Sequence, residues 1–79
     1  MDYFTAARAF VRAAELGSFS KAAQELGVKI STVSRQVVEL ERDLGIALFN
    51  RSTRGLALTE GGQTFLQHAR QALEALDEA

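Results

Sequence analysis

Apolar residues recur every three or four positions in four segments of the 79-residue chain, the spacing of one face of an α-helix. The four sets are Phe4, Ala7, Val11 and Ala14 with Phe10; Ala22, Ala23 and Leu26; Val33, Val37, Leu40 and Leu44; and Leu66, Ala69, Leu73 and Leu76 with Phe65 and Ala72. Gly17, Gly27 and Gly45 follow the first three sets, and glycine often ends a helix in the left-handed conformation. The pattern predicts four helices, with Ser20 as the expected cap of the second.

The period changes between the third and fourth helices. Two short apolar runs flank the polar stretch "NRSTRG" there: Ile46–Phe49 and Leu56–Leu58. We expect a β-hairpin, because Gly55 can take the positive φ that such a loop often needs. Thr59 is the expected cap of the last helix, whose glycines at 61 and 62 indicate close packing or a fixed angle of approach. The order helix, helix, helix, hairpin, helix predicts a mainly α fold, the winged helix-turn-helix.

Composition excludes several kinds of site. The chain has no cysteine and a single histidine, so we expect neither a disulfide nor a metal centre. No paired carboxylates, nucleophile–base set or phosphate loop appears, so we expect no enzyme and no catalytic residue. We find no membrane span and no leader segment, and a cytoplasmic protein is the expectation.

Charge is unevenly distributed along a chain whose formal net charge is −1. Residues 18–59 carry six cations against four anions, whereas residues 60–79 carry one arginine against four anions. A local positive face in the middle of the chain can therefore attract phosphates despite the acidic total.

The third helix presents an unusual exposed face. At 100° per residue, Ser31 and Arg35 lie nearly opposite the apolar stripe, with Thr32 and Ser34 on its flanks. Hydroxyls and a guanidinium suit base edges and phosphates, and the second helix of a helix-turn-helix enters the major groove. The hairpin adds three polar residues, of which the arginines can enter a narrow minor groove: Arg51, Thr53 and Arg54.

The segments "GSFSKAAQELGV", "VSRQVVELERDLGIALFNR" and "RGLALTEGG" resemble the N-terminal DNA-binding domain of LysR-type transcriptional regulators. The resemblance implies a winged domain over residues 1–59 and a dimerising linker helix over 60–79. It also implies a C-terminal domain that binds a small effector and is absent from this chain, which itself is expected to hold no cofactor. Members of the family act as dimers or tetramers on double-stranded DNA with interrupted inverted repeats.

The resemblance carries DNA-facing roles onto a defined set of positions, with the helix at about 30–43 in the major groove and the wing at about 50–56 in the adjacent minor groove. The set is Ser20, Ile30, Ser31, Thr32, Ser34, Arg35, Arg51 and Arg54. The family typically reads "VSQPAVSRQI" where this chain reads "VKISTVSRQV", so lysine, isoleucine and serine replace the cap serine, a glutamine and a proline. Lys29 is expected to meet a phosphate, while Ile30 either contacts a thymine methyl or seals the core.

The last helix is longer than so small a core can cover. We expect it to pack on its own domain at its start and on a partner's helix further along, through a dimerisation set of Phe65, Leu66, Ala69, Leu73 and Leu76. Arg8, Arg12, Arg42 and Arg70 are expected to be surface or ion-pairing residues, and Arg35 can pair with Glu39. The alternative from another class is a winged-helix module that docks proteins rather than DNA.

Overall fold

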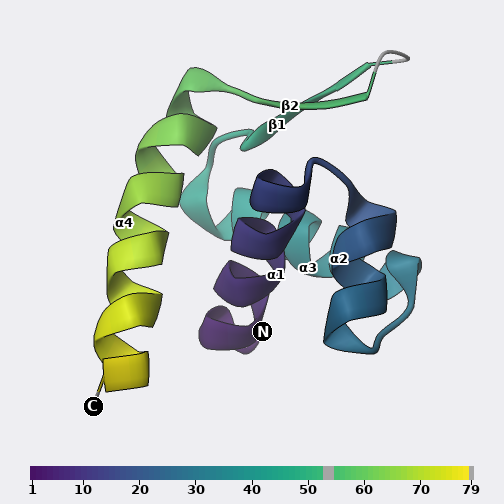
Figure 1. Ribbon diagram of the computed structural model, residues 1–79. Helices are drawn as coiled ribbons and strands as arrows, with labels where there is room; N and C mark the ends of the chain where they lie inside the picture. Colours follow the sequence, from purple (N-terminus) through teal and green to yellow (C-terminus); the bar gives the residue numbers. More distant parts are fainter. Residues whose placement is uncertain (53–54, 79) are drawn as a thin grey trace.

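The computed structural model describes residues 1–52 and 55–78 and confirms the predicted order of elements within them (Figure 1). The elements are α1 (Tyr3–Leu16), α2 (Phe19–Leu26), α3 (Ile30–Leu44), β1 (Phe49–Ser52), β2 (Gly55–Leu58) and α4 (Glu60–Glu78). The mainly α, winged helix-turn-helix architecture is confirmed. Within the described segments, every helix is too short or too polar to cross a membrane.

The N-cap of α2 lies two residues before the expected one. The side chain of Ser18 accepts a hydrogen bond from the backbone N–H of Lys21 at 3.1 Å, and the backbone of Ser18 is extended. Ser18 is therefore the N-cap, and the expectation that Ser20 caps this helix is wrong. Ser20 lies instead at the second helical position with its side chain exposed.

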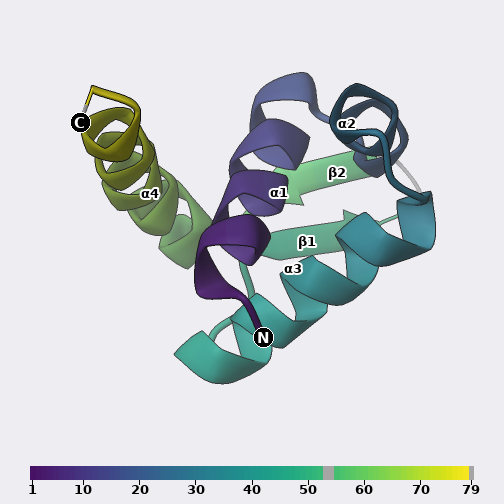
Figure 2. The same cartoon turned by 90° about the horizontal axis from the view of Figure 1, so that it is seen from below.

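The helix α1 lies in the centre of the domain, with α4 on one side and α2 and α3 on the other (Figure 2). Neighbouring helices pack on several sides of α1 because many of its side chains are small: Ala6, Ala9 and Ala13 are fully buried. The predicted stripe on this helix is therefore too narrow, and Phe4, which it included, is 40% exposed. Phe10 stacks at tilted angles on Phe49 and Phe65, with ring centroids 5.4 and 5.5 Å apart.

The hairpin starts later than the apolar run predicted. Strands β1 and β2 pair antiparallel from Phe49 opposite Leu58 to Ser52 opposite Gly55, so the expected first strand at 46–49 is wrong except for its last residue. The carbonyl of Leu48 accepts a hydrogen bond from Thr59 N at 3.0 Å, next to the last ladder pair, but the Leu48 N–H is bound by the side chain of Glu41 at 2.8 Å. The Leu48 side chain is fully buried, so this segment belongs to the core rather than to the ladder.

The first turn of α4 lies directly on the backbone that precedes the hairpin. Thr59 caps the helix as predicted, because its hydroxyl oxygen accepts a hydrogen bond from Gly62 N at 2.9 Å. The same hydroxyl donates to the carbonyl of Ala47 at 2.6 Å. A Cβ added to Gly62 would lie 2.1 Å from the carbonyl oxygen of Leu48, so this position requires glycine. The close packing that the paired glycines indicated is confirmed.

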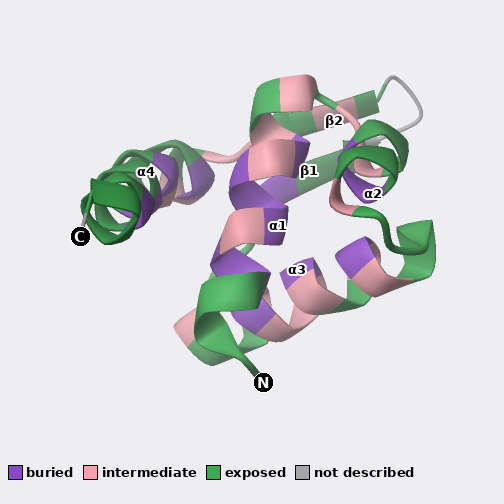
Figure 3. Cartoon of the chain, turned by 60° about the horizontal axis from the view of Figure 1, so that its bottom comes forward, coloured by how far each residue is buried: buried purple, intermediate pink, exposed green. Residues whose placement is uncertain are grey.

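Further along, α4 completes the core on the outer side of α1 (Figure 3). Leu66, Ala69 and Leu73 are buried, whereas Leu76 is 56% exposed. The division into a winged domain at 1–59 and a linker helix at 60–79 stays a prediction.

Candidate nucleic-acid interface

The apolar stripe of α3 fixes which side of this helix faces outward. Val33, Val37 and Leu40 are fully buried, as the helical spacing predicted. The predicted contact residues lie on the other side: Lys29, Ile30, Ser31 and Arg35 are exposed, and Thr32 and Ser34 are half-buried on the flanks. A continuous polar face about two turns long therefore begins at the N-terminus of α3.

Ile30 points away from the core. Its side chain is 52% exposed, and the neighbouring Val28 is 42% exposed. Of the two alternatives for Ile30, sealing the edge of the core is therefore wrong. An exposed β-branched side chain at the first turn of α3 is available for an apolar contact, such as one with a methyl group of a ligand.

The start of α3 has no side-chain cap. Lys29 occupies the N-cap position with φ −75° and ψ 152°, and its side chain makes no capping hydrogen bond. Ser31, which could have taken this role, lies inside the helix instead. The N–H of Thr32 bonds the carbonyl of Lys29 at 3.0 Å, so the N–H groups of Ile30 and Ser31 are the ones open to an external acceptor. The positive end of the helix dipole favours an anion there.

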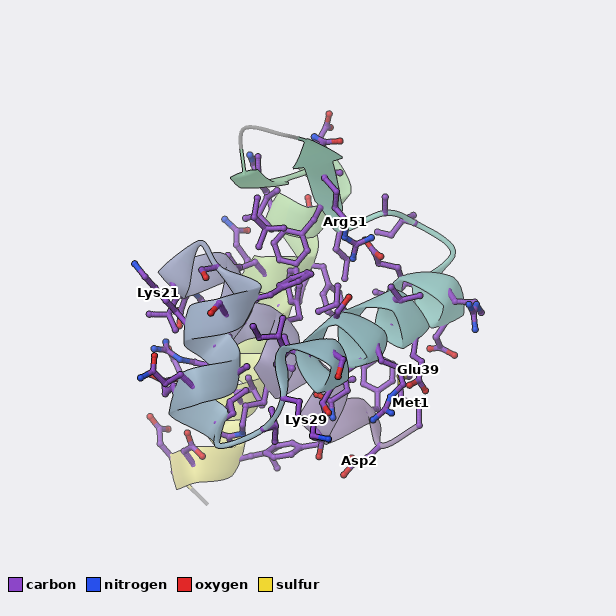
Figure 4. The ribbon with its side chains drawn as sticks, turned by 90° about the vertical axis from the view of Figure 1, so that its right-hand side faces the viewer. Met1, Asp2, Lys21, Lys29, Glu39 and Arg51 are labelled. Carbon is purple, nitrogen blue, oxygen red and sulfur yellow. The ribbon has the colours of Figure 1, made fainter. Side chains whose placement is uncertain are left out.

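Each element around the outward face of α3 contributes a cation. Figure 4 shows Lys21 at the left edge on α2, Lys29 below at the start of α3 and Arg51 above on β1. In the part of the chain that the structure describes, neither lysine forms an ion pair. Arg35 lies 3.5 Å from Glu39 in the predicted i,i+4 pair, and both groups are partly exposed. Such a pair is weak in water and leaves the guanidinium free to exchange partners.

Arg51 extends from β1 and is partly engaged by the protein itself. Its Nη2 lies 3.2 Å from Glu41 Oε1, and its guanidinium carbon lies 5.7 Å from the centroid of the Phe19 ring. The side chain remains 44% exposed. Arg51 therefore joins three elements, α2, α3 and β1, beside the outward face of α3.

Glu41 is a residue that the sequence reasoning missed. Its side chain is only 12% exposed, and its carboxylate accepts hydrogen bonds from Leu48 N at 2.8 Å and Phe49 N at 3.3 Å, as well as from Arg51. The available signal was a carboxylate directly after the buried Leu40, on the edge of the apolar stripe. The predicted wing residues Thr53 and Arg54 lie outside the described residues.

Charged side chains also join the helices on the opposite flank. Arg12 forms a two-point pair with Glu25, in which Nη2 lies 2.7 Å from Oε1, and it also pairs with Glu15. The hydrogen bonds from Arg12 lower the pKa of the Glu25 carboxyl below its usual value. Arg70 Nε lies 2.8 Å from Glu15, so this network reaches from α2 through α1 to α4. The ion-pairing expected of Arg12 and Arg70 is confirmed.

An apolar groove of about 360 Å³ lies between α1 and α4. It is lined by Tyr3, Phe4, Ala7, Phe65, His68, Ala69, Ala72, Leu73 and Leu76. Four of the five predicted dimerisation residues line this groove, whereas Leu66 is buried and is not among the lining residues. The groove extends the apolar surface beyond α4 onto the first turn of α1, which the sequence pattern had not included.

Comparison with known proteins matches residues 4–63 to the bacterial regulatory helix-turn-helix proteins of the lysR family. The chain is 54% identical over 72 residues to the HTH-type transcriptional regulator y4mQ of Sinorhizobium fredii, covering 91% of this chain and 24% of that protein. It is 47% identical over 70 residues to the probable HTH-type transcriptional regulator LtrA of Klebsiella pneumoniae, covering 89% and 23%. The chain thus spans about a quarter of the length of these curated relatives, which are named regulators and not enzymes.

Solved structures agree with this match. The chain is similar to a BenM DNA-binding domain in complex with catB site 1 DNA, with a TM-score of 0.91 and 37% identity over 95% of this chain and 84% of that chain. It is similar to full-length CbnR in complex with its target DNA, with a TM-score of 0.89 and 40% identity over 95% of this chain and 26% of that chain. The family match, the identities and the shared fold agree, and the chain belongs to the LysR family of bacterial regulatory helix-turn-helix proteins.

Proposed function

We propose that this chain is the DNA-binding part of a transcription regulator and that it recognises a specific sequence in double-stranded DNA. The outward face of α3, which starts at Lys29, carries the proposal, because buried residues hold that face rigidly away from the core. In this arrangement the first two turns of α3 enter the major groove, and the hairpin reaches the adjacent minor groove. The DNA complexes solved for BenM and CbnR support it by similarity.

Each exposed position has a proposed role that follows from its chemistry. Lys29 and the open N–H groups beside it meet a phosphate, and Ile30 packs on a thymine methyl. Arg35 leaves Glu39 for a guanine edge or a phosphate. Hydroxyl groups on α2 and α3 donate to phosphates or bases: Ser20, Ser31, Thr32 and Ser34. The wing residues Arg51, Thr53 and Arg54 contact the DNA at the adjacent minor groove.

A titration against a duplex selected by the chain from a random pool tests this proposal. Lys29→Ala and Arg35→Ala should each weaken binding and reduce the slope of log affinity against log salt by about 1. Arg42→Ala is the matched control, because Arg42 is an exposed cation in the last turn of the same helix. An affinity that does not change with salt concentration, or equal effects of all three substitutions on affinity, would overturn the assignment. A chain that selects no duplex would favour the protein-docking alternative.

We further propose that a second copy of the chain covers the groove between α1 and α4. An exposed leucine and two exposed aromatic residues border it, and continuous apolar surface of this kind invites association. A homodimer of this form suits an interrupted inverted repeat, since the symmetry of the DNA site mirrors that of the protein. A tetramer in the longer protein, a small effector bound outside this chain and a cytoplasmic location belong to the same proposal.

Sedimentation at several concentrations tests the dimer. Leu76→Glu should shift the chain toward monomer, because it places a charge in the groove. Gln71→Glu is the control, since it adds the same charge at an exposed position of α4 outside the groove. Leu73→Glu is unsuited to this purpose, because Leu73 is 8% exposed and its replacement would also damage the fold. Equal dimer constants for both variants would refute the groove as the interface.

A further inference from the structure

The carboxylate of Glu41 joins the recognition helix to the hairpin at one point. Both of its oxygens are used: Oε2 accepts from the N–H groups of Leu48 and Phe49, and Oε1 accepts from Arg51. Leu48 directly precedes β1, Phe49 is the first residue of the strand, and Arg51 lies two residues further along it. One side chain of α3 therefore holds both the start of the wing and its first arginine.

This attachment matters because a two-stranded hairpin has little stability of its own. Phe49 anchors one end of β1 in the core, but the next two residues, Asn50 and Arg51, are exposed. Beyond Phe49, the partner strand β2 packs on the core through Leu56 and Leu58. On the side of β1 that faces α3, Arg51 supplies the link, since it lies against Phe19 and Glu41. Hydrogen bonds to a charged, mostly buried acceptor are stronger and more directional than neutral ones.

We propose that Glu41 is a positioning residue for DNA recognition: it fixes the wing, through Arg51, at the distance and angle from α3 that two neighbouring grooves require. Glu41 need not touch the DNA, and its negative charge would repel phosphates if it did. The inference rests on the proposed DNA binding and adds a residue and a role to it.

The test compares Glu41→Gln with Glu39→Gln on the selected duplex. Both substitutions remove one negative charge from α3, so simple electrostatics predicts that both tighten binding slightly. Positioning predicts opposite signs: Glu39→Gln binds as tightly as the unchanged chain or more tightly, and Glu41→Gln binds roughly tenfold more weakly. Glutamine keeps an oxygen for the two backbone N–H groups, and thermal unfolding verifies that each variant is folded.

Footprinting separates positioning from a general loss of stability. Glu41→Gln should lose hydroxyl-radical protection in the minor groove beside the site, at protein concentrations that saturate the DNA, while guanine N7 in the major groove stays protected from methylation. Uniform loss of both protections, or retention of both, would overturn the inference. If the unchanged chain selects no duplex at all, the proposed function fails instead, so the two failures are distinguishable.

A double substitution tests whether Glu41 acts through Arg51. If it does, Glu41→Gln combined with Arg51→Gln should weaken binding by about as much as Arg51→Gln alone, because Glu41 has no guanidinium to position once Arg51 is replaced. Multiplication of the two single effects would show that the residues act independently and would refute the coupling.

Discussion

Gly62 should tolerate no side chain, because the first turn of α4 rests on a peptide group. A Cβ at this position would lie 2.1 Å from the carbonyl oxygen of Leu48 and 3.1 Å from Leu58 Cδ2. Carbon and oxygen atoms approach one another to about 3.3 Å without repulsion, so the first contact is too short by about 1.2 Å. The Leu48 carbonyl cannot simply move aside, since it also accepts the hydrogen bond from Thr59 N.

The expected magnitude follows from two opposing effects. Overpacking of this kind costs about 3 kcal/mol at a site that cannot relax, and alanine in place of glycine returns up to about 1 kcal/mol of helix propensity. Gly62→Ala should therefore lower the free energy of unfolding by about 2 kcal/mol, from a total of about 4–12 kcal/mol for a domain of this size. The corresponding fall in melting temperature is about 8–16 °C.

Gly61→Ala supplies the matched control for this measurement. Its Cβ would lie 3.0 Å from Ile46 Cδ1, the end of an exposed side chain that can rotate away. Urea titration and thermal unfolding followed by circular dichroism should show Gly61→Ala at or slightly above the stability of the unchanged chain. A Gly62→Ala chain as stable as the Gly61→Ala chain would refute the reasoning.

Three further outcomes can be checked by the same unfolding measurements. Ser18→Ala should cost about 1 kcal/mol and Ser20→Ala almost nothing, because only the first removes a cap; equal costs would contradict the corrected boundary of α2. Lys29→Ser should raise stability by about 0.5–1 kcal/mol by capping α3, at the expense of DNA affinity; unchanged stability would show that the backbone cannot accept this cap. The lowered pKa of Glu25 means that its pairing stabilises the fold above the usual carboxyl pKa and that this contribution disappears as pH falls through the lowered value. The stability difference between the unchanged chain and Glu25→Gln should therefore shrink as the pH falls below the usual carboxyl pKa, and a constant difference would contradict it.

Periodicity predicted the helices well because each buries one clear face or ends at a glycine. Gly17, Gly27 and Gly45 all adopt positive φ at the predicted helix ends. The pattern was less informative where tertiary contacts decide the outcome. Phe4 has the right spacing for the core of α1 but is partly exposed beside α4, and the N–H of Leu48 is bound by the Glu41 side chain.

The outward face of α3 could also be predicted from spacing, because Val33 and Val37 determine what lies opposite. The role of Glu41 could not: its place at the edge of the apolar stripe indicates partial burial, but the groups that it binds come from a later segment. Arg51 illustrates the same limit: sequence alone suggested a wing cation, while its contact with Phe19 appears only when α2 and β1 are brought together.

The exposure of the first turn of α3 has a consequence for evolution. Lys29, Ile30 and Ser31 are all exposed, and the helix they begin is held by residues further along, such as Val33 and Leu40. Substitutions at these three positions therefore leave packing intact, while each alters a group that faces outward. After gene duplication, a few nucleotide changes can therefore give such a domain a new binding specificity, while every intermediate protein remains stably folded.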